Sequence, residues 1–493
     1  MNIIKSKIQW IFWIMFTACV SCNKPNNNST PSPPQVSGEK IINSFGFKSS
    51  NNPGLMADVN GIISTDSIML SLPADASLKS LIPSIIFKGK SIEPQNNVAQ
   101  DFSSPIAYTV TAEDGSIKKY IVIATVQPSP ATIFWNTSYS SASLNPADLG
   151  YVYALDANTG KLRWKYSPAS YSFKATPAFA DGILYISNYH KVIALDTATK
   201  ATKWEFGLSN TIYAAIAVVN NVVYFNCNDG NLYAVDAKTG KMVWKFSQDN
   251  DDPYNTDPLS CRSAPTVVNG TVYFGNSRSK YIYALDAKSG SLKWKTFNTL
   301  PSAGAFQSGP SVVNGIVYIG DVSQNVIALD ANNGNIKWSF AANAGFGSSP
   351  TVVNGVVYIA VFNYLYALDA ANGTLKWKFA AQFEIDGSPT VVNGTAYFGG
   401  GGGNGSVLYA VDVTTGTEKW RYSHYGLTDV EDPIVFNDLV YFSIDYDFIA
   451  LDIKTGKLKW KFSANDGREG GFSPCIVDIK GNVYYPAESG LQQ

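Results

Sequence analysis

The feature that most constrains the fold of this chain is one motif that returns eight times between residues 153 and 460. Each copy reads approximately Tyr-Ala-Leu-Asp-Ala-x-x-Gly-x-x-x-Trp, and its tryptophan always stands eight residues after its aspartate. The aspartates are Asp156, Asp196, Asp236, Asp286, Asp330, Asp369, Asp412 and Asp452, and the tryptophans are Trp164, Trp204, Trp244, Trp294, Trp338, Trp377, Trp420 and Trp460. Successive copies are 39 to 50 residues apart. This period indicates a repeat architecture, in which each unit buries its apolar surface against its neighbours.

A second motif, Ser-Pro-Thr-Val-Val-Asn-Gly-x-Val-Tyr-Phe-Gly, lies between the copies and is clearest at 264–275, 349–360 and 388–399. Its Asn-Gly pair predicts a tight turn between two strands. Tyr-Ala-Leu-Asp predicts a third strand, and the residues around the tryptophan predict a fourth. The aspartate can accept local backbone amides, and the glycine can take the left-handed conformation of the turn. Residues 128–493 therefore predict an all-β fold, an eight-bladed β-propeller of four-stranded blades, with each tryptophan between neighbouring blades.

The two ends of the repeat region predict how the ring closes. Residues 472–485 contain two strand patterns with no following Asp-to-Trp half, whereas residues 151–164 contain that half with no clear partner before it. We expect these segments to complete one blade together. The Ile-Phe-Trp sequence at 133–135 is a competing strand for the same blade.

Residues 41–127 predict a small immunoglobulin-like β-sandwich before the propeller. Short apolar runs alternate with turn residues, and Glu113-Asp-Gly-Ser116 is a strong hairpin signal. The segment Tyr108 to Ile117 resembles the small immunoglobulin-like domains common in Bacteroidetes lipoproteins. This resemblance implies a stalk or spacer, with a separate ligand-binding role as the alternative.

Residues 1–22 predict a lipoprotein signal peptide. Lys5 and Lys7 precede an apolar run over 8–20 that is too short to span a bilayer comfortably. Ser21-Cys22 resembles the lipobox of bacterial lipoproteins, which implies lipidation of Cys22; Cys19 is a second candidate, and an ordinary secretory peptide is the alternative. Residues 23–40, rich in Asn, Ser and Pro, predict a flexible tether. We expect a lipid-anchored outer-membrane protein. In some Bacteroidetes lipoproteins, which this segment resembles, acidic residues directly after the lipidated cysteine favour display on the cell surface. Residues 23–25 contain none, which slightly favours the periplasmic face.

The propeller repeats resemble the pyrroloquinoline-quinone repeat family. Members of this family include quinoprotein dehydrogenases and non-enzymatic lipoproteins such as the propeller subunit of the outer-membrane barrel-assembly machine. The dehydrogenases carry an adjacent cysteine pair, Ca²⁺ ligands and long enclosing insertions, whereas Cys227, Cys261 and Cys475 are not adjacent here. We expect no catalytic residues, no metal and no cofactor. A net charge of -1 with 15% charged residues also argues against a nucleic-acid partner.

Binding is expected on the long crossovers that follow each tryptophan, because these segments hold most of the variation between repeats. Equivalent positions around the mouth of the ring are Lys174, Tyr213, Arg262, Gln307, Gly347 and Asp386, with Glu431 one residue later. Aromatic residues near them are Tyr171, Phe173, Tyr254, Phe306, Phe346, Phe383, Tyr425 and Phe472. Such rings suit sugars or extended peptides, and packing between blades is the alternative for about half of them. The sequence favours a non-enzymatic binding or scaffold module for envelope proteins or glycans. The alternative is a surface receptor for glycan or peptide in a nutrient-uptake system, and a quinone-dependent dehydrogenase is less favoured.

Three further sequence features each have two interpretations, one structural and one functional. Cys227 and Cys261 are candidates for a disulfide, with two separate buried thiols as the alternative, and Cys475 is expected to remain free. The glycine-rich segment 399–405 is interpreted as a flexible hairpin loop and not as a nucleotide-binding turn. Asp249, Asp251, Asp252 and Asp257 are interpreted as a solvated acidic loop, with a cation site as the alternative.

Overall fold

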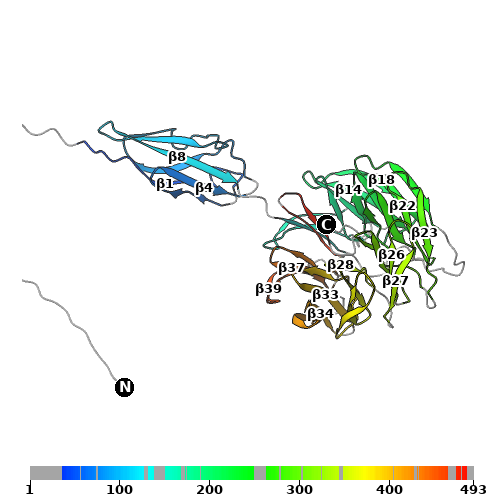
Figure 1. Cartoon of the computed structure of the whole chain (residues 1–493). Coiled ribbons are helices and arrows are strands. Elements are labelled where there is room, and N and C mark those ends of the chain that lie inside the picture. The colour runs from blue at the N-terminus through cyan, green and yellow to red at the C-terminus, as the bar shows by residue number, and fades with distance from the viewer. Residues whose placement is uncertain are drawn as a thin grey trace, which may run out of the picture. The chain divides into compact units, whose positions relative to one another are not determined.

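The computed structural model divides the chain into two compact units, Met1–Gln127 and Pro128–Gln493 (Figure 1). It describes residues 36–126, 131–137, 150–167, 173, 175–248, 263–300, 304–342, 348–402, 405–426, 430, 432–464 and 473–485, apart from residues 56, 74, 75, 189, 277, 278, 324 and 479. All the regular elements of this described part are β-strands. It contains no helix with the length and apolar character that crossing a membrane requires.

The first unit is a small β-sandwich. Its strands are β1 (Ile41–Phe47), β2 (Val59–Asn60), β3 (Ile62–Ile63), β4 (Ser67–Leu72), β5 (Pro83–Lys88), β6 (Ser91–Glu93), β7 (Ile106–Thr111) and β8 (Ile117–Val126). They form two sheets, ordered β2-β1-β5 and β3-β4-β8-β7-β6. Side chains alternate between buried and exposed along β4, so its inward face packs into one core with Phe45, Phe47, Phe102 and Tyr108.

The second unit is a β-propeller, in which the described residues form seven four-stranded sheets and one five-stranded sheet. The five-stranded sheet has the order β11-β10-β9-β40-β41 and contains β9 (Thr132–Asn136), β10 (Val152–Asp156), β11 (Leu162–Tyr166), β40 (Cys475–Val477) and β41 (Val483–Tyr484). The four-stranded sheets are, in chain order, β12 (Ala178–Ala180), β13 (Ile183–Asn188), β14 (Lys191–Asp196) and β15 (Thr202–Gly207); β16 (Ala217–Val219), β17 (Val222–Cys227), β18 (Asn231–Asp236) and β19 (Met242–Ser247); β20 (Thr266–Val268), β21 (Thr271–Gly275), β22 (Tyr281–Asp286) and β23 (Leu292–Phe297); β24 (Ser311–Val313), β25 (Ile316–Gly320), β26 (Asn325–Asp330) and β27 (Ile336–Ala341); β28 (Thr351–Val353), β29 (Val356–Val361), β30 (Tyr364–Asp369) and β31 (Leu375–Ala380); β32 (Thr390–Val392), β33 (Thr395–Gly402), β34 (Gly405–Asp412) and β35 (Glu418–His424); and β36 (Ile434–Phe436), β37 (Leu439–Ile444), β38 (Asp447–Asp452) and β39 (Leu458–Ser463).

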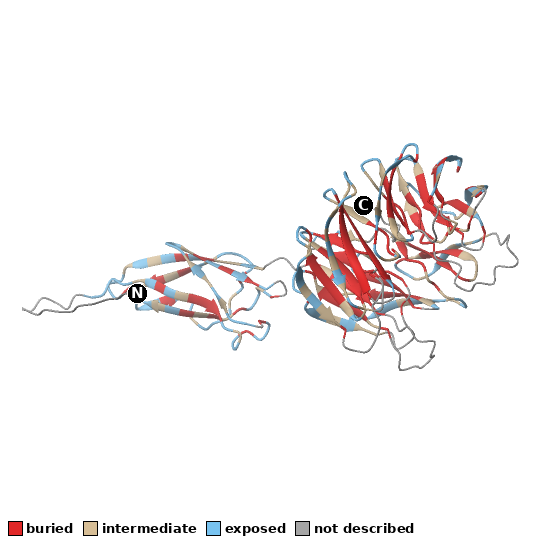
Figure 2. Cartoon of the chain, turned by 90° about the horizontal axis from the view of Figure 1, so that it is seen from below, coloured by how far each residue is buried: buried red, intermediate tan, exposed pale blue. Residues whose placement is uncertain are grey.

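Hydrophobic clusters between neighbouring sheets close the sheets into a ring. Each cluster draws buried side chains from two adjacent sheets, and one of them joins β36–β39 to the five-stranded sheet through Phe448, Trp135 and Ile476. Figure 2 shows the buried residues running along the strands and the exposed residues at the turns. The predicted fold class, an all-β propeller preceded by a small immunoglobulin-like sandwich, is confirmed.

The five-stranded sheet contains both segments that were expected to complete one blade, residues 151–164 and 472–485, together with the competing strand at 133–135. This strand, β9, lies between β10 and β40, with Trp135 opposite Tyr153 on one side and Ile133 opposite Ile476 on the other. The competing 133–135 segment therefore takes the second position of the blade. Its Ile133, Phe134 and Trp135 are all buried, and burial of these apolar side chains stabilises this placement.

The recurrent motif joins each sheet to the next. Seven of the eight motif tryptophans donate an indole N–H to a carbonyl in the following sheet, as Trp294 does to Ala331 at 2.9 Å. The glycine of the motif has a φ near 70° and lies against the tryptophan of the preceding repeat: a β-carbon on Gly334 would be 2.6 Å from Trp294 Cε3. Glycine is thus required both for the turn and for the packing. Lys200 stands at this position in one repeat, with a φ of 61°.

The Ser-Pro-Thr motif joins neighbouring inner strands. The Thr351 hydroxyl donates to the Pro389 carbonyl of the next blade, and Thr390 donates to Pro433 at 2.6 Å. The backbone N–H of Ser349 donates to the Ser388 hydroxyl at 3.1 Å. These buried hydrogen bonds hold the inner strands around the centre of the ring and leave the crossovers to project from one face.

Candidate ligand-binding face

Strand direction assigns the loops of the propeller to two faces. Asn-Gly turns and Asp-x-x-x-Gly turns lie on one face, here called the turn face. The loops between second and third strands, together with the crossovers from each outer strand to the next inner strand, lie on the other, here called the crossover face. The topology of the sheets supports this assignment because all neighbouring strands within them are antiparallel.

On the turn face each motif aspartate organises its own turn. Asp412 accepts the backbone N–H groups of Thr414 and Thr415 and pairs with Lys419 at 3.1 Å. The hydrogen bond from Lys419, followed by those from the turn amides, lowers the pKa of Asp412 to about 2. A Lys or Arg at the same spacing pairs with the aspartate in six other repeats. This recurrence indicates a structural role.

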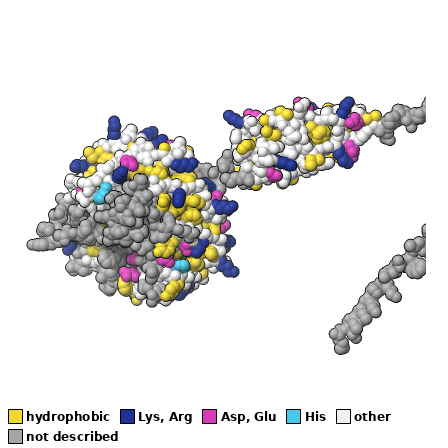
Figure 3. All heavy atoms as spheres, turned by 180° about the vertical axis from the view of Figure 1, so that it is seen from behind, with side chains coloured by type: hydrophobic (Ala, Val, Ile, Leu, Met, Phe, Trp, Pro, Cys, Tyr) yellow, Lys and Arg dark blue, Asp and Glu magenta, His cyan; other side chains and the backbone are white. Residues whose placement is uncertain are grey.

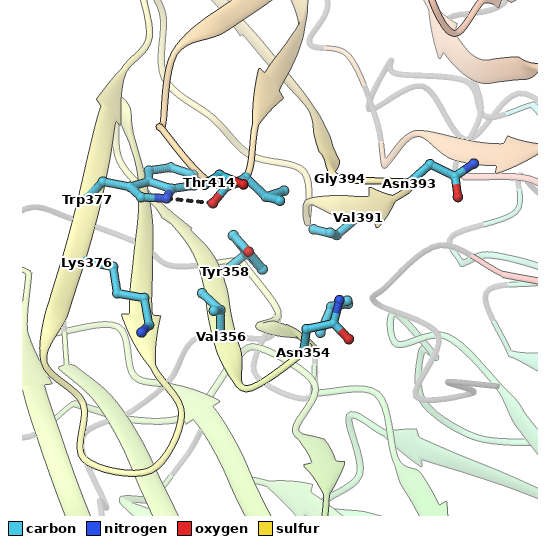
Figure 4. Close-up of a pocket in the computed structure, with 11 residues that line it drawn as sticks. Asn354, Val356, Tyr358, Lys376, Trp377, Val391, Asn393, Gly394 and Thr414 are labelled. Atoms are coloured by element: carbon cyan, nitrogen blue, oxygen red, sulfur yellow. Dashed lines mark hydrogen bonds between the residues drawn. The ribbon is translucent and has the colours of Figure 1, made fainter.

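A cavity of about 600 Å³ lies on the turn face between the sheets β28–β31 and β32–β35 (Figure 4). Tyr358, Trp377 and Asn393 are among its lining residues. The Trp377 indole N–H donates to the Val413 carbonyl at 2.8 Å, and Lys376 pairs with Asp369 at 3.0 Å. These contacts repeat at other interfaces between sheets. The cavity is therefore a structural feature of the repeat. It lies on the face opposite to the one on which the sequence predicts binding.

The structure places three of the predicted mouth residues equivalently. Tyr213, Gln307 and Asp386 each stand four residues before the first residue of an inner strand, namely β16, β24 and β32. These strands belong to blades that are not adjacent, so the three side chains surround the ring and do not form one cluster. Lys174, Arg262, Gly347 and Glu431 lie outside the described residues.

The aromatic residues predicted near the mouth divide into two groups. Phe173 and Phe306 are fully buried in clusters between sheets, so for these two the alternative of packing between blades holds. Phe383 is half-buried, and Tyr425 is 85% exposed. Tyr171, Tyr254, Phe346 and Phe472 lie outside the described residues.

Two exposed aromatic residues on the crossover face were missed by sequence reasoning. Phe362 lies in the two-residue turn between β29 and β30, and Tyr446 lies in the matching turn between β37 and β38. They are 44% and 49% exposed. Phe362 also has a φ of 54°, which is uncommon for a bulky side chain. In the sequence they lie in runs of strand-like residues, and each turn is marked only by one turn residue, Asn363 or Asp445.

The crossover at 381–386 is anchored to its neighbours on both sides. The Ala381 and Ile385 N–H groups donate to the carbonyls of Asn363 and Phe362, at 2.8 and 2.7 Å. On the other side, the Gly401 N–H donates to the Glu384 carbonyl at 2.9 Å. Burial first, and the negative charge of Asp386 second, raise the pKa of Glu384.

The glycine-rich segment forms part of a hairpin that is longer than those of the other blades. Gly399–Gly402 belong to β33 and pair with β34 as far as Gly402 opposite Gly405, so the interpretation of these residues as a flexible loop is wrong. A β-carbon on Gly400 would lie 2.9 Å from the Glu384 carbonyl oxygen. The missing side chains thus let the crossover pack directly on the strand. Residues 403 and 404 lie outside the described residues.

The far side of this hairpin connects to the next blade. A β-carbon on Gly405 would lie 3.4 Å from Phe383 Cζ and 3.6 Å from the His424 carbonyl oxygen. His424 Nε2 lies 3.1 Å from Asp445 Oδ2, in the turn between β37 and β38. Figure 3 shows one face of the propeller, on which histidine side chains lie close to both acidic and basic side chains.

The cysteines do not make a common site in the described part of the chain. Cys227 is buried in β17, where its thiol donates to the Asn210 carbonyl at 3.5 Å, and Cys475 is buried in β40. Burial raises the pKa of the Cys475 thiol. Cys261 lies outside the described residues, as do the four aspartates at 249–257, so the proposed disulfide and the acidic loop stay predictions. Within the described residues, no group of three or more His, Cys, Asp or Glu side chains is arranged to hold a metal ion.

Comparisons with known proteins bear on both units. Residues 148–318, 278–423 and 323–484 match the PQQ-repeat family model described as outer membrane protein assembly factor BamB, and residues 50–124 match the family model described as SGBP, N-terminal. No curated protein sequence matches the chain.

Among solved structures, BamB from Moraxella catarrhalis is 19% identical, with 59% of this chain and 87% of that chain covered and a TM-score of 0.50. The computationally designed Ika8 protein is 15% identical over 64% and 95% of the two chains, with a TM-score of 0.52. The quinohemoprotein alcohol dehydrogenase ADHIIG from Pseudomonas putida HK5 is 16% identical over 65% and 75%, with a TM-score of 0.49. At these identities the likeness to solved structures concerns the fold alone.

Proposed function

Because the chain belongs to the PQQ-repeat family described as outer membrane protein assembly factor BamB, which matches well over half of its length, we propose that it is a non-enzymatic binding or scaffold protein of the cell envelope. In this proposal a lipid at Cys22, or at Cys19, holds the chain at the outer membrane. The sandwich acts as a stalk, and the propeller presents its crossover face to an envelope protein or a glycan. The periplasmic orientation is slightly favoured by residues 23–25.

The observation that carries this proposal is the contrast between the two faces of the propeller. On the turn face the polar groups of the repeat are used in structural contacts, as those of Asp412, Lys419 and Trp377 are. On the crossover face the loops differ from blade to blade and expose large side chains such as Tyr425. Variable loops on a rigid scaffold are the usual place for binding.

The residues of this chain do not fit the quinone site of the dehydrogenase branch. In the dehydrogenases an adjacent cysteine pair packs against the quinone. Here Cys227 and Cys475 lie in different clusters between sheets. Cys261 is adjacent to neither of them in sequence. The proposed function therefore involves no quinone.

A surface receptor for glycan or peptide is the second candidate function. It is favoured by the match of the sandwich to the N-terminal family of SGBP proteins and by the exposed aromatic residues of the crossover face. Aromatic rings beside hydrogen-bonding groups suit such ligands. Both candidates place the ligand on the same face.

We predict that the purified protein takes up no pyrroloquinoline quinone. Incubation with quinone and Ca²⁺, followed by desalting, should leave no bound chromophore, and a dye-linked alcohol oxidation assay should show no turnover. A quinoprotein alcohol dehydrogenase treated in parallel provides the positive control. Stoichiometric uptake with turnover would overturn the non-enzymatic assignment.

We also predict that the mouth residues contribute to binding and little to stability. Replacing Arg262 or Asp386 with alanine should weaken capture of a ligand found by pulldown from envelope extracts or on a glycan array. We expect the melting temperature to barely change; Asp386 is exposed, and substitutions at exposed positions usually alter stability by less than about 0.5 kcal/mol. Unchanged capture by both variants would contradict the assignment of the mouth.

A further inference from the structure

One continuous region of the crossover face combines exposed rings with carboxylates. It extends over three neighbouring blades, from the β29–β30 turn through the 381–386 crossover and the β33–β34 hairpin to the β37–β38 turn. We name it the aromatic-acidic surface and define it by Phe362, Glu384, Asp386, Tyr425, Asp445 and Tyr446.

The parts of this surface are held together by contacts already described. Ile385 N–H bonds to the Phe362 carbonyl, and Gly401 N–H bonds to the Glu384 carbonyl. The Gly405 backbone approaches both the Phe383 ring and the His424 carbonyl, and His424 reaches Asp445. A ligand therefore meets a preformed set of loops, which reduces the ordering cost of binding.

The charge of this surface is of one sign. The described segments 362–363, 381–386, 400–402, 405, 424–426 and 445–446 contain three carboxylates and no lysine or arginine. One of these carboxylates, Asp445, is paired with His424. Lys461, on the neighbouring outer strand β39, is paired with Asp447 at 2.9 Å. Asp386 is exposed, and its charge contributes to the raised pKa of Glu384. Charge complementarity therefore favours a cationic ligand and disfavours phosphate or acidic polysaccharide.

The rings point to the same ligand class. Tyr425, Tyr446 and Phe362 present aromatic surface to solvent, and an arginine guanidinium can stack on such a ring while it pairs with a nearby carboxylate. A peptide that binds by adding a strand needs a free strand edge. The long hairpin offers little free edge, since β33 bridges to Glu384 at Gly401 and β34 pairs with β35. We therefore expect recognition through side chains.

We propose that the aromatic-acidic surface binds an arginine-containing segment of a partner protein. The arginines stack on Tyr425 and Tyr446 and pair with the carboxylates of Glu384 and Asp386, while Asp445 stays paired with His424. The reach across three blades suits an extended segment with several basic residues. This inference rests on the proposed binding function and names the kind of partner that the crossover face takes.

The test uses the full purified chain and a fluorescein-labelled peptide, (Arg-Gly)4, in a fluorescence anisotropy titration. The wild-type protein should bind this peptide, should bind (Lys-Gly)4 more weakly and should not bind (Glu-Gly)4. Tyr425→Ala and Asp386→Asn should each weaken binding at least about tenfold, and their melting temperatures should match that of the wild type.

Matched controls lie away from the surface. Phe297→Ala removes a ring that is 43% exposed, and Glu205→Gln removes an exposed carboxylate paired with Lys191. Both should bind (Arg-Gly)4 within about twofold of the wild type. Equal losses in the control and surface variants would overturn the inference, as would no binding by the wild type or displacement of the peptide by maltoheptaose.

The same variants separate this inference from the broader proposal. If the wild type and Tyr425→Ala capture the same envelope protein or glycan equally well, the surface is not the binding site, but the binding function stands. If the wild type captures neither, the proposed function itself fails.

Discussion

Replacing Trp294 with alanine is expected to lower the free energy of unfolding of the propeller by about 3–5 kcal/mol, the usual range for a buried tryptophan. The side chain is 8% exposed and lies between two sheets. Its indole N–H donates to the Ala331 carbonyl at 2.9 Å, and its ring packs against Tyr273 with a centroid distance of 6.0 Å. Alanine leaves a cavity there and removes one of the donors that the buried carbonyl accepts.

The measurement is denaturant unfolding followed by tryptophan fluorescence and circular dichroism. The sandwich has its own hydrophobic core, so its transition should not move and serves as an internal reference. Leu292→Ala is the matched control on the same strand, because Leu292 is 46% exposed; it should cost less than about 0.5 kcal/mol. Similar losses in the two variants would contradict the role of the tryptophan between the sheets.

The repeats can be predicted from the sequence because the same packing requirement, a turn followed by an outer strand, recurs eight times. The spacing from aspartate to tryptophan reports a turn and an outer strand, and both recur wherever two sheets must pack. Gly334 illustrates this link, since its left-handed backbone and its contact with Trp294 demand the same residue. The fold class follows from such recurrence with no need for tertiary information.

The closing blade shows where that reasoning stops. Residues 132–136 carry no repeat motif, so their strand competes with two C-terminal strands that look equally suitable. The outcome depends on which side chains reach the clusters on either side of the sheet: Trp135 and Ile133 enter one, and Phe134 enters the other. That information is tertiary and is absent from local patterns.

The candidate site was only partly accessible from sequence for a similar reason. Tyr425, Phe383 and Asp386 were recognised by their position after an outer strand. Phe173 occupies a similar position but is buried, whereas Phe362 and Tyr446 lie in tight turns that are marked only by Asn363 and Asp445. Exposure of an aromatic ring depends on the packing of the neighbouring blade, which one sequence does not reveal.

Deleting residues 473–493 is expected to abolish the cooperative unfolding transition of the propeller. The deletion removes β40, which pairs with β9, and β41, which pairs with β40. Cys475 and Ile476 are fully buried and belong to the clusters on the two sides of the closing sheet, so two packed interfaces are lost together. The exposed edge of β9 would then also be open to pairing with other chains.

The end of this hairpin also contacts the blades on either side. The Tyr485 hydroxyl accepts from the Phe179 N–H at 2.8 Å and donates to the Phe179 carbonyl at 2.9 Å, at the free edge of β12. Tyr484 packs on Phe436 with a centroid distance of 4.9 Å. Because only the hydroxyl is lost, Tyr485→Phe should cost about 1–3 kcal/mol through the unsatisfied groups of Phe179. Tyr485→Phe is therefore a milder variant that tests the same closing segment as the deletion.

Both variants are measured by differential scanning calorimetry alongside the full chain. The deletion should retain the transition of the sandwich and lose that of the propeller, and Tyr485→Phe should keep both with the propeller shifted to lower temperature. If closure of the ring did not depend on the C-terminal strands, the deletion would retain a propeller transition close to that of the full chain. That result would mean that the hydrophobic clusters between the other sheets hold the ring without β40, and it would refute closure by the two chain ends.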